Sequence, residues 1–434
     1  MELFLFSSYI ILALSAFFSI QSIIRLLRKS KFTGYIIFIL VLILFFVLPM
    51  FLDLISDVPF DLYPTIYKAW KDPLTTILYS NYMSVVLIYF TANMRNVKHS
   101  DVNIISLQNA FLRIFNRYKF VFYIVLILPF ISVFLSDNPS FYFKYRSTLG
   151  FKFSPIYPNT HALSSKLCLL SIICIAFLIT VMRLNVENKI KKYNILNWII
   201  VILLVVSYCW IDGKRAIVAV FLSIIFILFM SVKLINRKNL GRSCFFLVAI
   251  FLAFNVVYGK NINTSESAKT QKKARLEFSR DYGVRFNIYN EILQDHYFLP
   301  HKLDTYKFNM AFYVPRKYWK DKPQPYAVYF TNAAFGNFGR GSIYGWGLTT
   351  NAFSEGISNL GWIGLIIVPF FLNWILKRET KSNKPLFKLV SILVAILSLV
   401  LQPMPFMPII ILYFILLFND KKNKEIHKIK HKAL

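Results

Sequence analysis

The sequence alternates long apolar runs with short polar loops, and this pattern leaves few folds open to the chain. A lipid bilayer offers no hydrogen-bond partner to the backbone, so a chain crosses it as helices of about 20 residues or as a closed barrel. The apolar runs have the helical length, and 57% of the residues are hydrophobic. We predict an all-α polytopic membrane protein with about 11 spans, near residues 3–24, 33–53, 74–93, 120–136, 161–182, 195–211, 215–232, 243–258, 356–376, 387–402 and 404–418.

Lysine and arginine are unevenly distributed between the two sets of loops. The loops after the odd-numbered spans, together with the C-terminal tail, hold 28 of the 50 basic residues. Cytoplasmic loops carry such an excess, whereas long translocated loops are largely exempt from it. We therefore predict that the N-terminus lies outside and the C-terminus inside. The same distribution explains the net charge of +30, so we expect no nucleic-acid partner.

One loop is long enough to form a domain of its own. We divide the chain into spans one to eight (1–258), a large extracytoplasmic loop with amphipathic helices (259–355), spans nine to eleven (356–418) and a basic cytoplasmic tail (419–434). Within the loop, residues 274–293 are predicted to be helical, because apolar residues recur at helical spacing. They are Tyr282, Phe286, Tyr289 and Leu293. Arg285 follows Asp281 by four residues, which a surface ion pair would also explain.

The short loop between spans six and seven carries two adjacent cations on the predicted outer side. It contains Asp212, Gly213, Lys214 and Arg215, and span seven begins directly after it. A helix N-terminus favours anions, and the planar guanidinium fits phosphate oxygens in a bidentate manner. Gly213 permits the sharp reversal, and Asp212 could orient the arginine. The sequence therefore predicts an anion site, although a polar turn whose cations reach the headgroups is the alternative.

Further candidates lie in the other outer loops. The basic residues of the large loop include Arg275, Arg280, Arg285, Arg316, Lys317, Lys322 and Arg340, and a solvated surface would account for most of them. The candidate bases are Glu355, His296, His301 and His161. Glu355 precedes a span in glycine-rich surroundings, where a carboxylate without a role would be costly. Small residues at this point, among them Gly356 and Gly364, allow close helix packing.

Several familiar motifs do not occur in the sequence. Nucleotide-binding glycine loops, the Gly-x-Ser-x-Gly elbow and HExxH are absent. No Asp-x-Asp occurs, which argues against a metal-bound nucleotide-sugar site. We expect no metal and no cofactor, and an enzyme on the outer face would need a lipid-activated donor.

Three stretches of the chain resemble the oligosaccharide repeat-unit polymerases, the Wzy-type polymerases of O-antigen and capsular polysaccharide. The first is Trp210–Ala216, which is similar to the short outer loop of that family with its arginine. The second is Val314–Pro323, which resembles a Pro-Arg…Lys-Pro motif in the large loop. The third is Thr350–Gly364, which contains Glu355 and Asn359 and leads into the next span. As motifs these stretches cover 32 residues, whereas the architecture resembles the family over most of the chain.

The resemblance implies a metal-independent, GT-C-like glycosyltransferase in the bacterial cytoplasmic (inner) membrane. Its substrates would be undecaprenyl-pyrophosphate-linked glycans, and its partners would include a flippase and a chain-length regulator. We expect Arg215, Arg285, Arg316 and Glu355 in catalysis, and Lys214, Asp212, Arg280, Lys322, Arg340 and His161 in substrate binding. Ligase-like relatives place a key histidine near the end of the large loop, whereas here the loop histidines lie in its middle, so the resemblance does not identify the base.

Two other functions fit parts of the same pattern. An O-antigen-ligase-like transferase would use the same leaving group. A flippase or transporter for the lipid-linked sugar belongs to a different class, and its proteins often have paired halves and charges within the spans. Here the halves look dissimilar and the span interiors are nearly free of charge, which favours the enzyme.

Overall fold

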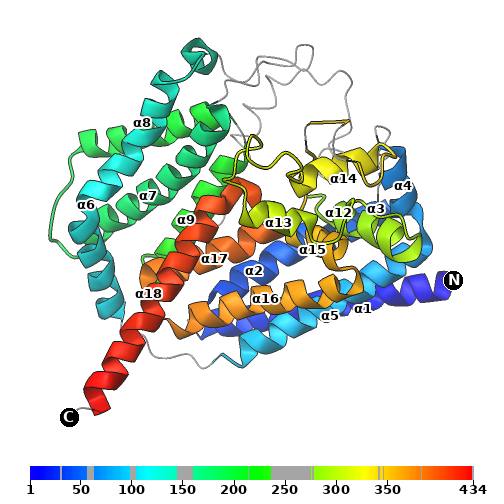
Figure 1. Cartoon of the computed structure of the whole chain (residues 1–434). Coiled ribbons are helices and arrows are strands. Elements are labelled where there is room, and N and C mark those ends of the chain that lie inside the picture. The colour runs from blue at the N-terminus through cyan, green and yellow to red at the C-terminus, as the bar shows by residue number, and fades with distance from the viewer. Residues whose placement is uncertain are drawn as a thin grey trace. The chain divides into compact units, whose positions relative to one another are not determined.

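A computed structural model describes residues 1–29, 32–55, 63–97, 104–143, 160–213, 215–235, 275, 278–340, 343–345, 347–382 and 384–432. The described residues form helices and connecting loops, and no strand occurs among them (Figure 1). Among the described residues, six helical segments are long and apolar enough to cross a membrane. They are Glu2–Arg28, Gly34–Leu54, Pro73–Arg95, Gln108–Phe134, His161–Glu187 and Ile195–Asp212. Shorter apolar helices cover Val220–Ser231, Pro385–Val400 and Met404–Asn419.

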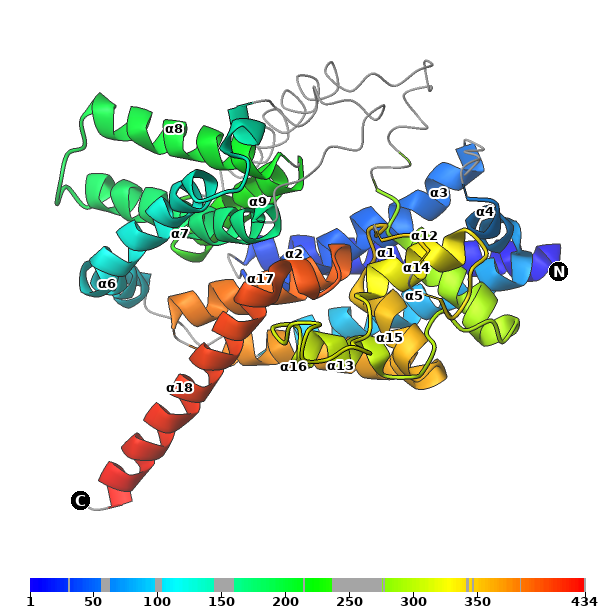
Figure 2. The same ribbon diagram turned by 45° about the horizontal axis from the view of Figure 1, so that its top comes forward.

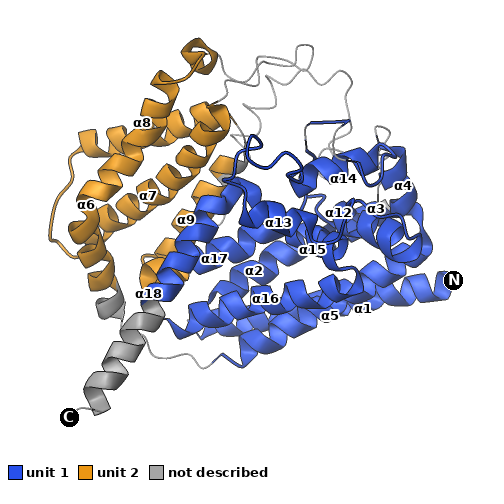
Figure 3. Ribbon diagram, viewed as in Figure 1, with its two compact units in different colours: residues 1–99, 268–382, 390–434 blue, residues 100–267, 383–389 orange. Residues whose placement is uncertain are grey.

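The chain divides into two compact units (Figure 3). Unit 1 contains residues 1–99, 268–382 and 390–434, and unit 2 contains residues 100–267 and 383–389. The described part of the predicted outer loop therefore belongs to the same unit as the first membrane helices. The predicted span at 243–258 lies outside the described residues.

Unit 1 begins with long helices. These are α1 (Glu2–Arg28), the continuous series α2 (Gly34–Leu42), η1 (Ile43–Val47) and α3 (Leu48–Ile55), and α5 (Pro73–Arg95). Helices α1 and α5 run in the same direction. Helix α1 packs along α5 through small side chains, and the hydroxyls of Ser19 and Thr91 lie 2.8 Å apart. Small residues of this kind let membrane helices approach closely. The outward face of α1 is apolar and exposed, as expected of a helix in contact with lipid.

The second half of unit 1 contains the short helices of the predicted outer loop. They are α12 (Asp281–Asn287), which continues into the π-helix η5 (Ile288–Leu293), α13 (Asp304–Met310), α14 (Tyr326–Ala334) and α15 (Ala352–Leu360). Both α12 and α14 pack against α4 (Pro64–Lys71), as two views show (Figures 1 and 2). Aromatic residues fill the core between them, including Trp70, Phe286, Phe298 and Phe330. These short helices are thus built onto the membrane helices.

The predicted span at 356–376 is interrupted near its start. Helix α15 ends at Leu360, Gly361 adopts a φ of 60°, and α16 (Trp362–Lys381) follows. The two helices are in close contact, because a Cβ built on Gly364 would lie 2.1 Å from the carbonyl oxygen of Gly356. The prediction that small residues allow close packing here is confirmed, and α16 covers most of the predicted span but begins six residues later.

The two ends of the continuous series α2–η1–α3 contact different parts of unit 1. The backbone N–H of Gly34, at the start of α2, donates to Glu379 near the end of α16 at 3.4 Å. At the other end of the same span, Asp53 of α3 contacts the segment 275–285. Helices α17 (Pro385–Val400) and α18 (Met407–Lys432), joined by the 3₁₀ turn η6 (Met404–Phe406), complete the C-terminal part of the chain.

Unit 2 is a helical bundle with its own core. It consists of α6 (Ile104–Phe134), the 3₁₀ turn η2 (Pro139–Phe143), α7 (His161–Glu187), α8 (Ile195–Asp212) and α9 (Arg215–Ser231). Helix α7 packs against α6, α8 and α9. The rings of Phe111 and Phe122 both stack on Phe177, at centroid distances of 4.9 and 5.2 Å.

Candidate functional site

Glu355 lies in the first turn of α15 and is almost completely buried, with 1% of its surface exposed. The helix is capped by Asn351, whose side-chain oxygen accepts from the N–H of Ser354 at 3.0 Å. One carboxylate oxygen of Glu355 accepts from the hydroxyl of Thr305 at 2.9 Å and from the amide of Asn309 at 2.8 Å, both on α13. The other oxygen, Oε2, has no hydrogen-bond partner among the described residues.

This environment changes the acid–base behaviour of Glu355. Burial raises its pKa to about 7, while the hydrogen bonds from Thr305 and Asn309 oppose the rise. Within the described part of the chain, no lysine, arginine or histidine forms a salt bridge with it. A carboxylate with a pKa near neutrality can both take up and release a proton at physiological pH, as a general base requires.

A second buried carboxylate, Glu291, lies on the π-helix η5. It accepts from the backbone N–H of Phe298 at 2.8 Å and from the side-chain amide of Asn287 at 3.2 Å. The same amide donates to Ser358 of α15 at 2.6 Å. Burial raises the pKa of Glu291 to about 7, and the nearby hydrogen bonds oppose this. Helix α15 therefore has a carboxylate of its own, Glu355, and is hydrogen-bonded through Asn287 to a second one.

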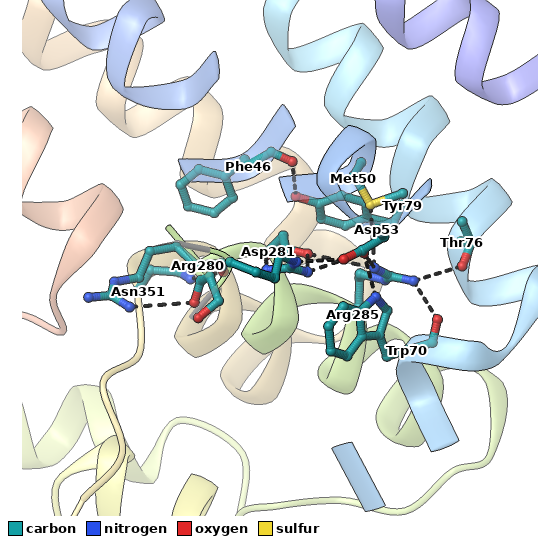
Figure 4. Close-up of polar contacts among 12 residues, drawn as sticks. Phe46, Met50, Asp53, Trp70, Thr76, Tyr79, Arg280, Asp281, Arg285 and Asn351 are labelled. Atoms are coloured by element: carbon teal, nitrogen blue, oxygen red, sulfur yellow. Dashed lines mark hydrogen bonds and ion pairs between the residues drawn. The ribbon is translucent and has the colours of Figure 1, made fainter. Parts of the chain in front are cut away.

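Four charged side chains form a buried ion cluster between α12 and α3, and Figure 4 labels three of them, Asp53, Asp281 and Arg285. Asp53 binds Arg275 through Nε at 2.5 Å and Arg285 through Nη1 at 3.0 Å. Asp281 binds Arg275 at 2.8 Å and lies 3.6 Å from Arg285. Two positive and two negative charges cancel, which makes their burial tolerable.

Trp70, on α4, extends this cluster. Its indole N–H donates to Asp53 at 2.5 Å, and its ring lies 4.4 Å from the guanidinium of Arg275. Its carbonyl oxygen accepts from Arg285, which also donates to the hydroxyl of Thr76 at 3.0 Å (Figure 4). The cluster thus joins the 275–285 segment to α3, α4 and the first turn of α5.

The position of Arg285 differs from that of a surface residue. Arg285 and Asp281 are 2% and 0% exposed, so they are not the surface pair that their spacing also allowed. The helix predicted over 274–293 is confirmed from Asp281 onward, whereas residues 278–280 form a turn and a loop.

Arg316 and Lys322, from the Pro-Arg…Lys-Pro stretch, hold one another's backbone segments. Arg316 donates to the carbonyl oxygens of Lys322 at 2.6 Å and Pro323 at 3.1 Å. The ammonium of Lys322 donates to the carbonyl oxygens of Phe312 and Val314, at 2.8 and 2.7 Å. These hydrogen bonds to backbone carbonyls stabilise the local fold of the motif, a role that the spacing of its residues did not reveal.

Arg280 lines a small cavity of about 190 Å³ in unit 1, next to the start of α12. Its Nε donates to the carbonyl oxygen of Val400 at 3.2 Å, and its own carbonyl accepts from Asn351 at 3.0 Å. Asn351 also caps the helix that carries Glu355. Asn351 therefore holds the backbone of Arg280 in the cavity wall and also the helix that carries Glu355.

The remaining loop candidates lie at the surface. Arg340, His296 and His301 are exposed, and the ring of His296 lies 5.4 Å from that of Phe338. No group of three His, Cys, Asp or Glu side chains that could hold a metal ion occurs in the ranges the structure covers.

The other predicted site residues belong to unit 2. Gly213 follows the end of α8 with a φ of 64°, a left-handed conformation that glycine adopts readily, and α9 begins at Arg215. Asp212 is buried and accepts a hydrogen bond from Ser165. His161 is buried beside Phe141 and Tyr142. Lys214 and the side chain of Arg215 lie outside the described residues.

The structure thus brings Arg280, Arg285 and Glu355 onto two packed helices, α12 with its preceding turn and α15. Sequence reasoning missed Asp53 and Trp70 as members of the site. Asp53 carried a usable signal, because a carboxylate at the end of an apolar span needs a partner. No protein-family model, curated protein or solved structure matches the chain.

Proposed function

We propose that this protein is a membrane-embedded glycosyltransferase. It joins undecaprenyl-pyrophosphate-linked oligosaccharide repeat units into O-antigen or capsular polysaccharide on the outer face of the bacterial cytoplasmic membrane. The proposal includes eleven spans in a GT-C-like arrangement, with the N-terminus outside and the C-terminus in the cytoplasm. A flippase would deliver the repeat units, and a chain-length regulator would act with the enzyme.

The observation that carries this proposal is the buried carboxylate of Glu355. In the transfer step, an acceptor hydroxyl loses its proton to Glu355 while its oxygen forms a bond to the anomeric carbon of the donor glycan. Oε2 is the carboxylate oxygen left to accept that proton, because Oε1 already accepts two hydrogen bonds. A pKa of about 7 suits the task.

The same step breaks the bond between the anomeric carbon and the pyrophosphate. Undecaprenyl pyrophosphate leaves with the bonding electrons, and the growing glycan is then attached to the carrier of the acceptor unit. Arg215 is assigned to stabilise the departing charge, because α9 begins at this residue and a helix N-terminus favours anions. Loss of one such donor costs on the order of 3–4 kcal/mol in enzymes.

The contacts within unit 1 support the proposed topology. Asp53, Thr76 and the segment 275–285 lie together, and each is assigned to the outer face. Gly34 and Glu379 also lie together, and both are assigned to the cytoplasmic face. A candidate base on the outer segment is where an extracytoplasmic polymerase needs one.

A complementation experiment tests the proposal. In a strain that lacks the gene, we expect the wild-type protein to restore a ladder of long glycans. Glu355→Gln should leave single repeat units, because the amide cannot take up a proton. Arg215→Ala should have the same phenotype. Glu187→Gln, at an exposed ion pair with Arg183, is the matched control and should restore the ladder.

Three results would contradict the proposal. A normal ladder with Glu355→Gln at wild-type protein level would remove Glu355 from the mechanism. Full-length glycan accumulating on the carrier in the deletion strain would indicate a ligase, and repeat units retained in the cytoplasmic leaflet would indicate a flippase.

A further inference from the structure

The side chain of Asn359 lies one helical turn after Glu355 on α15 and is completely buried. Its amide nitrogen Nδ2 donates to the hydroxyl of Thr305 and to the backbone carbonyl oxygen of Glu355, both at 2.7 Å. A carbonyl oxygen can only accept a hydrogen bond, so the second contact fixes the orientation of the amide. The amide oxygen Oδ1 is left without a hydrogen-bond partner among the described residues.

The hydroxyl of Thr305 links the two side chains. It accepts from Nδ2 of Asn359 and donates to Oε1 of Glu355 at 2.9 Å. The carboxylate and the amide therefore meet around one hydroxyl. Each has a second oxygen, Oε2 and Oδ1, that receives no hydrogen bond in the described part of the chain. Two buried acceptors without a donor are unfavourable, and a proton on Oε2 turns one of them into a donor.

Two buried tyrosines on neighbouring helices also respond to the charge on Glu355. They are Tyr306 of α13 and Tyr326 of α14, and burial and the nearby carboxylate raise the pKa of both. Both phenols are therefore neutral near pH 7. Neither donates a hydrogen bond to Oε2 of Glu355 or to Oδ1 of Asn359.

The charged groups on the elements packed against α15 have contacts of their own. On α13, Lys307 pairs with Asp304 at 3.4 Å, and on α12, Asp281 and Arg285 belong to the ion cluster. Glu291 of η5 accepts from a backbone N–H and a side-chain amide. Helix α16 has its charged residues at its far end, in positions 377–381. None of these groups supplies a donor to Oε2.

We propose that Asn359 is a positioning residue for the proton on Glu355: when the carboxyl group is protonated, its Oε2–H donates to Oδ1 of Asn359. In the transfer step the acceptor hydroxyl loses its proton to Oε2, and once the product has moved away the new O–H group turns to Asn359. This source of the proton rests on the proposed function, whereas the same hydrogen bond forms when the proton comes from water.

Asn309 has the opposite effect on Glu355. Its amide donates to Oε1 at 2.8 Å and so stabilises the charged form. The same substitution at the two asparagines should therefore move the titration of Glu355 in opposite directions. Asn359→Leu removes the acceptor of the protonated form and should lower the midpoint by about 0.5–1 pH unit, whereas Asn309→Leu should raise it by a similar amount. Loss of a polar neighbour alone would raise the midpoint in both variants.

Infrared difference spectroscopy of the purified full-length protein in nanodiscs measures these midpoints without turnover. The carbonyl stretch of the protonated carboxyl group is followed against pH, and the band of Glu355 is the one that Glu355→Gln removes. Glu291→Gln removes the band of the other buried glutamate and should leave that of Glu355 in place. Asn359→Asp has nearly the shape of the wild type and keeps an acceptor oxygen. Its second carboxylate should share one proton with Glu355 and raise the midpoint.

A midpoint that rises or stays unchanged in Asn359→Leu would overturn the inference. If that variant does not fold, Asn359→Asp decides, because an unchanged midpoint there would place residue 359 out of reach of the proton. The expected shifts in a protein that makes no polymer would keep the hydrogen bond and reject the polymerase. In an active protein, the pH of half-maximal polymerisation should fall in Asn359→Leu by the same amount as the infrared midpoint.

Discussion

At the scale of single residues, the protein limits the cost of burying a carboxylate in two different ways. Glu291 and Glu355 are buried without a salt bridge in the described part of the chain, so burial moves their pKa to about 7. Asp53 and Asp281 are instead matched by two arginines. Charges that are only structural are generally paired, whereas an unpaired carboxylate with a shifted pKa in the protein interior is typical of a functional group.

Glu291→Gln should change the pH dependence of stability. The folded pKa of about 7 exceeds the ordinary value of 4.5, so the folded protein binds protons more strongly between these values. Stability is then highest below about pH 4.5 and falls as the pH rises through 7. The amide removes this effect, worth about 3 kcal/mol, so the variant should unfold at a higher temperature than the wild type at pH 8. Thermal unfolding in detergent across pH 4.5–8 measures this, and an unchanged pH dependence would contradict it.

Asp53→Asn should destabilise unit 1, because it leaves two buried guanidinium groups with one full counter-charge. Breaking a buried ion pair costs about 3–5 kcal/mol. The double variant Asp53→Asn, Arg285→Gln restores charge balance and should recover part of the loss. Unfolding temperatures of the single and double variants give the comparison, with Glu187→Gln as an exposed control expected to cost less than about 1 kcal/mol. A double variant no more stable than Asp53→Asn would show that charge balance is not the cause.

The sequence could indicate these residues but not their pairing. Glu355 was a candidate because a carboxylate entering a span is costly, and its burial fits that reasoning. Asp53 and Arg275 are 222 positions apart, and no spacing rule connects such residues. The contact depends on the way the outer segment packs onto α3 and α4, which is a property of the fold.

At the scale of elements, the sequence predicted the long apolar helices well, because their composition determines them. It predicted helix breaks and helix starts less well, because these depend on a few residues. The early spans coincide with apolar helices because their length and hydropathy are sufficient. The break at Gly361 and the start of α12 at Asp281 depend on local backbone geometry and on packing partners, which periodicity does not contain.

Gly364→Ala tests the contact between α15 and α16. A Cβ at this position would lie 2.1 Å from the carbonyl oxygen of Gly356, so the helices must move apart. Overpacking of this kind costs about 1–3 kcal/mol, and it should also displace Glu355 and reduce polymer length. Gly345→Ala is the control, because nothing lies within 4 Å of its Cβ position. Equal unfolding temperatures for the two variants would contradict the close contact.

At the scale of the whole molecule, the candidate residues are divided between the two compact units. Glu355, Arg280 and Arg285 belong to unit 1, and Asp212, His161 and Arg215 belong to unit 2. Substitution of Glu355 therefore tests a residue of unit 1, and substitution of Arg215 tests a residue of unit 2.

The central claim is tested most directly with purified protein in nanodiscs and lipid-linked repeat units, extracted from the source cells, as the only substrate. We expect glycans that lengthen by whole repeat units, with one undecaprenyl pyrophosphate released per unit added. The rate should rise with pH through about 7, as Glu355 loses its proton, and Glu355→Gln should form no polymer at any pH. Repeat units that stay single with the wild-type protein, or equal polymer from both proteins, would contradict the account.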